Sequence, residues 1–243
     1  MTQLASDKLA PRPGPQTADD VELRARASGG TSADVIYRVA AAAIARRAAP
    51  ADESIGSIFD IGCGTGALRS YLQLDPSDRY VGVDVVRYDA LPADAEFRPS
   101  DLDTPRWPID DAVADVSVSV ETIEHLENPR AFFRELARIT KPGGLIVVTT
   151  PNQLSLLSKL ALVVKNQFMA FQERPGQYPA HRTALLEIDL IHIARECGLT
   201  EIEVTYTNRG RIPGTAWHWP ARLGMTGRTF SDNVCLSARK PAP

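Results

Sequence analysis

The feature that most constrains this chain is an apolar run that ends in an acid and is followed at once by three glycines. It reads Ile-Phe-Asp-Ile-Gly-Cys-Gly-Thr-Gly over residues 58–66. Glycine has no Cβ and readily adopts a positive φ, so a ligand can lie directly against the backbone of such a loop. The pattern therefore predicts a buried strand that runs into a tight ligand-binding loop.

Two classes of ligand use a loop of this kind. A dinucleotide fingerprint reads G-x-G-x-x-G/A after a strand, and Gly62, Gly64 and Ala67 fit it. The fingerprint also needs an acid about 20 residues further on, where Asp84 stands. Asp60 argues against a dinucleotide, because its carboxylate would lie close to a pyrophosphate bound at the next helix. A cationic ligand without phosphate, such as S-adenosylmethionine (SAM), suits this acid better.

Composition narrows the class of protein. A length of 243 residues suits one α/β domain with appendages. The formal net charge of −3 gives no support for a large basic surface, so we expect no nucleic-acid partner. No apolar run is long enough for a membrane span. The three cysteines lack C-x-x-C spacing, which favours reduced thiols and a cytoplasmic location. No pattern in the chain fixes an oligomeric state.

Strand-like and helix-like patterns alternate, which predicts right-handed βαβ units and a parallel sheet. We expect a disordered N-terminal segment over residues 1–30 and one domain over 31–243. Strands are expected at 57–61, 80–84, 96–98, 116–120, 145–149, 201–205 and 233–238. Helices are expected from an N-cap at Ser32 to Arg47 and over 67–72, 129–139 and 183–197, with a turn at Pro142-Gly143-Gly144.

Two segments, 152–181 and 207–230, interrupt this alternation. The first carries an apolar run that predicts a cap helix and a loop. The second is a long loop that contains Trp217-His218-Trp219. These three residues either line a substrate pocket or cover exposed sheet. We expect both segments to form a lid that selects the substrate.

Four motifs then fall in order along the chain. They are Asp60-Ile-Gly62-Cys-Gly64-Thr-Gly66, the strand end at Asp84, Val120-Glu121-Thr-Ile-Glu124-His125-Leu126, and Lys141-Pro142-Gly143-Gly144. Together they resemble class I SAM-dependent methyltransferases, and most closely the small-molecule O-methyltransferases of the ubiquinone-biosynthesis type. The stretch from Thr150 to His181 also resembles methyltransferases of bacterial glycan and natural-product pathways.

The resemblance implies a fold and an activity. The fold would be a Rossmann-like α/β sheet of seven strands, mostly parallel with an antiparallel last strand, and with helices on both faces. The activity would be methyl transfer from SAM to a small-molecule acceptor, at a hydroxyl oxygen.

The resemblance also implies a cofactor site. The methionine part of SAM would lie on the glycine-rich loop, at Gly62, Cys63, Gly64 and Gly66. Asp60 would be the acid near the ammonium group, and Asp84 would accept both ribose hydroxyls. The adenine edge would be read by Asp101 and Leu102, with Asp103 competing for that position. Val120 would end the strand beside the transferred methyl group.

Glu121, Glu124 and His125 are the candidate catalytic cluster. If this short segment is helical, spacings of three and four place all three side chains on one face. They could then bind a divalent metal, with His181 as a fourth ligand, as in some members of the resembled family. Alternatively, His125 acts as a metal-free general base beside Glu121. A third interpretation is that the segment only stabilises a turn.

Three other classes of function stay open at this point. An RNA 2′-O-methyltransferase would share the cluster at Glu121, Glu124 and His125, although the acidic balance of the chain disfavours it. A nicotinamide-dependent oxidoreductase would require that the Asp60 carboxylate does not repel the pyrophosphate of its cofactor. A non-catalytic SAM-binding protein would keep the loop and Asp84 and need no base.

Overall fold

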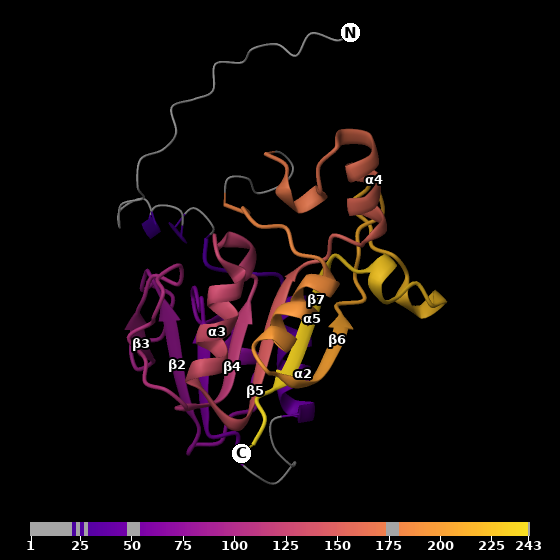
Figure 1. Cartoon of the computed structure of the whole chain (residues 1–243). Coiled ribbons are helices and arrows are strands. Elements are labelled where there is room, and N and C mark those ends of the chain that lie inside the picture. The colour runs from indigo at the N-terminus through magenta and orange to yellow at the C-terminus, as the bar shows by residue number, and fades with distance from the viewer. Residues whose placement is uncertain (1–20, 23–24, 27–28, 48–53, 174–179, 243) are drawn as a thin grey trace.

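The computed structural model describes residues 21–22, 25–26, 29–47, 54–173 and 180–242. Within them, seven strands form one sheet in the order β3-β2-β1-β4-β5-β7-β6 (Figure 1). The strands are β1 (Ser57–Ile61), β2 (Arg79–Asp84), β3 (Glu96–Pro99), β4 (Ala114–Val120), β5 (Thr140–Pro151), β6 (Thr200–Tyr206) and β7 (Asn233–Arg239). Strand β7 is antiparallel to both of its neighbours, and the other strands run parallel. The predicted fold class is confirmed.

Helices cover both faces of the sheet. On one face lie α3 (Pro129–Ile139) and α5 (Glu187–Glu196), and α2 (Asp34–Arg47) lies on the other (Figure 1). The side chain of Asn128 caps α3 by accepting a hydrogen bond from the backbone N–H of Ala131. The apolar face of α3 is fully buried because its residues recur at helical spacing: Phe132, Phe133, Leu136 and Ile139. None of the described helices is long and apolar enough to cross a membrane.

Several predicted boundaries need correction. Helix α2 begins at Asp34, two residues beyond the expected N-cap, and α5 spans 187–196 rather than 183–197. The predicted turn at Pro142-Gly143-Gly144 is wrong, because these residues lie inside β5. There the register with β4 shifts between Ala114 and Val116, and Gly143 has a φ of 79°. The glycines therefore form an irregularity in the strand instead of a turn.

Most of the segment 1–30 lies outside the described residues, and its disorder stays a prediction. The described residues at 21–22 and 25–26 are helical, and Arg26 pairs with Glu22 at 2.8 Å. The hydroxyl of Tyr88 donates a hydrogen bond of 2.5 Å to the carbonyl of Ala25. These described residues therefore contact the domain.

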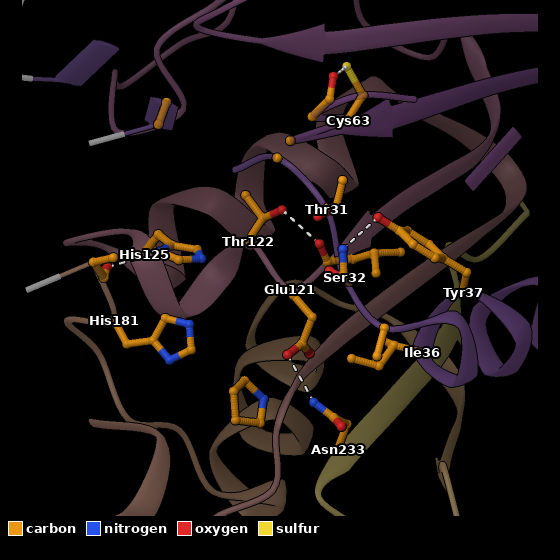
Figure 2. A pocket seen from close by; sticks show the side chains of 18 of the residues that line it. Thr31, Ser32, Ile36, Tyr37, Cys63, Glu121, Thr122, His125, His181 and Asn233 are labelled. Carbon is orange, nitrogen blue, oxygen red and sulfur yellow. Dashed lines mark hydrogen bonds between the residues drawn. The ribbon is translucent and has the colours of Figure 1, made fainter. Parts of the chain in front are cut away.

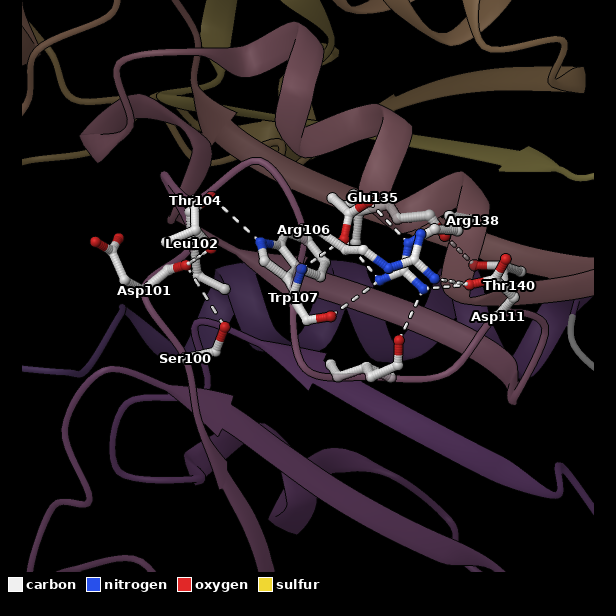
Figure 3. Close-up of polar contacts among 12 residues, drawn as sticks. Ser100, Asp101, Leu102, Thr104, Arg106, Trp107, Asp111, Glu135, Arg138 and Thr140 are labelled. Atoms are coloured by element: carbon white, nitrogen blue, oxygen red, sulfur yellow. Dashed lines mark hydrogen bonds and ion pairs between the residues drawn. The ribbon is translucent and has the colours of Figure 1, made fainter.

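The loop that follows β3 is anchored to α3 by a buried polar network (Figure 3). The backbone N–H of Trp107 donates to Glu135 Oε2 at 2.8 Å, and its indole N–H donates to the carbonyl of Leu102 at 3.3 Å. Arg138 pairs with Glu135 at 2.6 Å and also donates to the carbonyl of Ile109 at 2.7 Å. This network fixes the loop, and with it the position of Leu102.

We predict that Glu135→Gln destabilises the fold by about 3 kcal/mol, because it removes one partner of a largely buried ion pair. The side chains of Arg138 and Glu135 are only 13% and 8% exposed. Arg106→Gln is the matched control, since its ion pair with Asp111 is exposed and should contribute less than about 1 kcal/mol. Urea unfolding measures both values. Equal losses in the two variants would contradict the assigned role of the network.

Candidate active site

A cavity of about 780 Å³ opens at the carboxyl ends of β1, β2 and β4. Strand β1 pairs with β2 on one side and with β4 on the other, so the strand order reverses at this point. Ligands of open parallel sheets bind at such a reversal. The cavity is lined by most of the predicted cofactor residues: Asp60, Gly62, Cys63, Gly64, Asp84, Asp101, Leu102 and Val120.

The glycine-rich loop requires glycine because of neighbouring residues of the protein as well as to leave space for a ligand. Gly64 has a φ of 51°, and a Cβ there would lie 2.1 Å from the carbonyl oxygen of Gly30. A Cβ on Gly62 would lie 2.3 Å from the hydroxyl of Thr122. Gly66 does not line the cavity and precedes the 3-10 helix η1 (Ala67–Tyr71). Part of the glycine requirement therefore comes from the N-terminal segment and from Thr122 packing on the loop.

Asp60 is the most deeply placed acid of the cofactor side. It is 2% exposed and accepts a hydrogen bond from the hydroxyl of Tyr80. Burial raises the pKa of Asp60 to about 7, and the charge of Asp84 raises it further, while the Tyr80 hydrogen bond opposes the shift. A cation in the cavity would favour the ionised form of this carboxyl group.

Asp84 ties the end of β2 to the glycine-rich loop. Its Oδ2 accepts from the backbone N–H of Gly64 at 2.9 Å, and its Oδ1 accepts from the N–H of Val85 at 2.7 Å. Burial raises its pKa, against the effect of these hydrogen bonds. The carboxylate is therefore held at the cavity wall in a fixed orientation.

Asp101 and Asp103 both line the cavity, but they are held differently. Oδ1 of Asp103 accepts from the backbone N–H of Glu127 at 2.8 Å, which fixes the loop beside α3. Oδ1 of Asp101 accepts only a local hydrogen bond, from the N–H of Asp103 at 3.0 Å. Asp103 thus has a structural role that Asp101 lacks, which favours Asp101 as the ligand-binding acid.

The prediction that Glu121, Glu124 and His125 share one helical face is wrong. The helix η2 spans only Ile123–His125, and Glu121 precedes it with a left-handed φ of 51°. The Glu121 side chain instead accepts from Asn233 Nδ2 at 2.9 Å (Figure 2). Burial raises the pKa of Glu121 to about 8.

Glu124 is turned away from the cavity lining and is fully buried. Its Oε2 accepts from the hydroxyl of Thr150 at 3.2 Å, and its Oε1 has no hydrogen-bond partner among the described residues. Burial, followed by the charge of Glu121, raises the pKa of Glu124 well above its ordinary value.

His125 and His181 lie side by side at the cavity wall, with ring centroids 4.8 Å apart (Figure 2). His125 Nδ1 lies 2.9 Å from the carbonyl oxygen of Ala180. Burial lowers the pKa of His125, and burial together with His125 lowers the pKa of His181 to about 4. Both rings are therefore neutral at pH 7.

Potential metal ligands come together in a smaller set than predicted. Glu124, His125 and His181 each place one ligand atom within 4.8 Å of the others. Nδ1 of His181 is buried and has no hydrogen-bond partner among the described residues. Glu121 does not belong to this group, because its side chain lies against Asn233.

The two predicted lid segments also reach the cavity. Met169, Ala170, Ala180 and His181 line it from the first segment, and Arg209, Arg211 and His218 line it from the second. Of the Trp217-His218-Trp219 run, His218 alone lines the cavity, since Trp217 is 76% exposed and Trp219 packs on Phe230.

Other functional residues were not predicted from the sequence. Tyr37 in α2 lines the cavity and accepts a hydrogen bond of 2.8 Å from the N–H of Ser32 (Figure 2). Asn233 lines it because β7 pairs with β5 so that Asn233 faces Pro151. The sequence signal for Asn233 is its place at the start of the last strand. For Tyr37 the signal is an aromatic residue soon after the N-terminal segment.

The doubly wound sheet, its glycine-rich loop and the carboxyl-lined cavity define a Rossmann-like nucleoside-binding class. Residues 34–203 match the methyltransferase domain family. A ubiquinone biosynthesis O-methyltransferase of Maricaulis maris is 32% identical over 200 residues, which cover 76% of this chain and 72% of the relative. Another, from Cereibacter sphaeroides, is 26% identical over 76% of this chain and 73% of the relative.

A solved SAM-dependent methyltransferase from Thermotoga maritima has the same fold. Its TM-score is 0.61 at 19% identity, over 91% of this chain and 93% of that one. The chain therefore belongs to the SAM-dependent methyltransferase family. The resemblance stated from the motifs is confirmed.

We predict that SAM affinity depends on pH through Asp60. Because the pKa of Asp60 is raised to about 7, the free protein must release a proton from this group to bind a cation below that pH. Affinity should therefore fall by up to about tenfold per pH unit as the pH decreases below 7, and level off above it. Asp60→Asn should bind more weakly and lose most of this dependence. Calorimetry across this range measures both, and an unchanged pH profile in the variant would contradict the role of Asp60.

Proposed function

We propose that this protein transfers a methyl group from SAM to a hydroxyl oxygen of a small-molecule acceptor. The observation that carries this proposal is the neutral His125 ring, which shares the wall of the cavity with the carboxyl groups of the cofactor side. The relatives from Maricaulis maris and Cereibacter sphaeroides support a hydroxyl acceptor, because both are O-methyltransferases. The net charge of −3 disfavours a nucleic-acid acceptor. The absence of such an acceptor stays a prediction.

The lining of the cavity fits a cationic cofactor better than a dinucleotide. Asp60 and Asp84 lie near the ends of adjacent strands, and Asp101 and Glu121 are further acids of the cavity lining. A pyrophosphate placed there would meet carboxyl groups, whose ionised forms repel it. SAM, when bound, supplies a methyl group on a sulfonium that is already a good leaving group. The loop residues Gly62, Cys63 and Gly64 would hold its methionine part, Asp84 its ribose and Asp101 its adenine.

The protein's own contribution is alignment of the acceptor, exclusion of water and removal of one proton. The contact of His125 Nδ1 with the Ala180 carbonyl favours the tautomer in which Nδ1 carries the proton, and the ring is also held by a hydrogen bond to the backbone of Glu121. Nε2 then holds a lone pair and can accept the proton of a hydroxyl group. The lowered pKa of His125 keeps that lone pair free at neutral pH.

A test of this proposal uses catechol as the probe acceptor. The protein with SAM should release S-adenosylhomocysteine (SAH) and form the monomethyl ether of catechol, both of which are measured by mass spectrometry. Aniline, which offers nitrogen in place of oxygen, is the comparison acceptor. SAH release with aniline and none with catechol would contradict the proposal.

The pH profile of kcat/KM distinguishes His125 from Glu121 as the base. If His125 takes the proton, its lowered pKa places the acidic limb of the profile below about pH 6.5. If Glu121 takes it, the limb lies near its raised pKa of about 8. We predict the first profile, together with a loss of about 10²–10⁴-fold in turnover for His125→Ala. A limb near pH 8 that persists in His125→Ala would exclude His125.

A second candidate function for the same wall is metal binding by Glu124, His125 and His181. Two buried ligand atoms in this group, Glu124 Oε1 and His181 Nδ1, have no hydrogen-bond partner among the described residues. A carboxylate and two imidazoles are a ligand set typical of zinc, which would position and polarise the acceptor hydroxyl. Ligands of one zinc ion lie roughly 3.4 Å apart, so the three side chains would have to move closer together.

We predict for the metal candidate that Zn²⁺ raises the thermal midpoint of the wild-type protein and not that of Glu124→Gln. Glu121→Gln is the control, since Glu121 lies outside the ligand group and should keep the shift. Chelator should then abolish turnover, and added Zn²⁺ should restore it. Full turnover in chelator, with no thermal shift, would reject the metal and leave His125 as a metal-free base.

A further inference from the structure

Two arginines and one histidine of the second lid segment share one face of a short hairpin. Arg211 and His218 form an antiparallel bridge, and the N–H of Ile212 donates to the carbonyl of Trp217 at 2.8 Å. Directly opposed residues of a bridge share a face, and Arg209 is grouped with them because it lines the same cavity. All three line the cavity.

The other face of the hairpin is fixed against the domain. A Cβ on Gly210 would lie 2.7 Å from the carbonyl carbon and oxygen of Phe230, so the backbone packs directly on that residue. The ring of Trp219 meets the ring of Phe230 edge to face at 5.3 Å. The opposite face, which carries Arg209 and Arg211, is therefore the one that lines the cavity.

Positive charge on this face is only partly balanced. Arg211 pairs with Asp232 at 3.0 Å, which holds its guanidinium in place. No ion pair or side-chain hydrogen bond joins Arg209 to any other residue in the described ranges. Arg209 and His218 are both exposed and line the cavity. An arginine without a partner in a cavity wall is available to an anionic ligand.

The sheet order separates this face from the acidic part of the cavity. Asp60, Asp84 and Asp101 follow the β3-β2-β1 side, where the cofactor is proposed to bind. The hairpin follows β6 and is held by Asp232, next to the start of β7, at the opposite side of the sheet. His125 follows β4, which lies between these two sides.

We infer that the methyl acceptor is an anion, with a carboxylate or a phosphate ester that binds Arg209 and Arg211 while its hydroxyl group lies near His125. His218 supplies a further hydrogen bond at the same face. This inference rests on the proposed function and adds the chemical class of the substrate. The carboxylate of SAM itself is assigned to the glycine-rich loop on the other side of β4, so Arg209 serves the acceptor and not the cofactor.

The test measures binding to the full-length protein in its complex with SAH, where no turnover can occur. Calorimetry compares 3,4-dihydroxybenzoate with its neutral counterpart 3,4-dihydroxybenzyl alcohol, and phenyl phosphate with phenol. Each anion should bind about ten- to hundredfold more tightly than its neutral partner, the scale of a hydrogen bond to a charged group. The anion with the larger gain identifies whether a carboxylate or a phosphate is preferred.

Arg209→Gln should remove most of the preference for anions while SAH affinity and the thermal midpoint stay unchanged. Arg222→Gln is the matched control, because Arg222 is exposed in the same lid segment and does not line the cavity. It should keep the preference. The preference should also shrink in high salt, since the arginines are exposed.

The outcomes separate the two proposals. SAH binding and catechol methylation without any gain for the anions would overturn the anionic acceptor and leave the proposed function in place. An equal loss in Arg209→Gln and Arg222→Gln would overturn the role of Arg209. Weaker SAH binding in Arg209→Gln would place the arginine at the cofactor and overturn the inference. Failure of the wild-type protein to bind SAH would overturn both proposals.

Discussion

The reversal of strand order between β1 and β4 is the constraint on which the rest of the structure depends. The chain leaves β1 toward β2 on one side, and β4 continues toward β5 on the other, so the crossovers diverge. Their divergence opens a crevice at the carboxyl ends of these two strands that no crossover helix can fill. The glycine-rich loop and Glu121 are the first residues after the two strands, so both face this crevice.

The second constraint is the free-energy cost of burying ionised carboxyl groups in that crevice. Asp60 lies within β1, on the opposite face of the strand from the buried side chains of Phe59 and Ile61, and is only 2% exposed. Burial therefore raises its pKa, as it does for Glu121 and Glu124. Groups that are protonated in the free protein at neutral pH can ionise once a cation lies beside them. The same burial that destabilises the ionised acids thus favours a cationic ligand over an anionic one.

The sequence was sufficient for those features that depend on local pattern. The strand at 57–61, the glycine-rich loop and the apolar face of α3 follow from residue type and spacing, and the structure contains each of them. The cavity lining at the ends of β1 and β2 was therefore largely predictable, apart from Gly66. The lining near β7 was not, because Asn233 and Arg211 reach the cavity through the register of β7 and through a hairpin. Neither long-range pairing leaves a periodic signal near the motif residues.

Glu121 shows why the catalytic wall departs from the helical pattern. A non-glycine residue with a φ of 51° is strained, at a cost on the order of 1–3 kcal/mol, and persists only when its surroundings hold it. Here the backbone N–H of Glu121 donates to the hydroxyl of Thr149 at 3.0 Å, and Asn233 holds its carboxyl group. Helical periodicity in the sequence does not predict such a turn.

The turn at Glu121 has a direct consequence for the chemistry of the wall. It redirects the chain after β4, so that Glu124 lies inside the protein against Thr150 while His125 meets the carbonyl of Ala180. Because Thr149 and Asn233 belong to β5 and β7, the orientation of the proposed base depends on the antiparallel pairing of those two strands. The last strand of the sheet therefore helps to fix the geometry of Glu121 and of the proposed base, although it supplies none of the predicted catalytic residues.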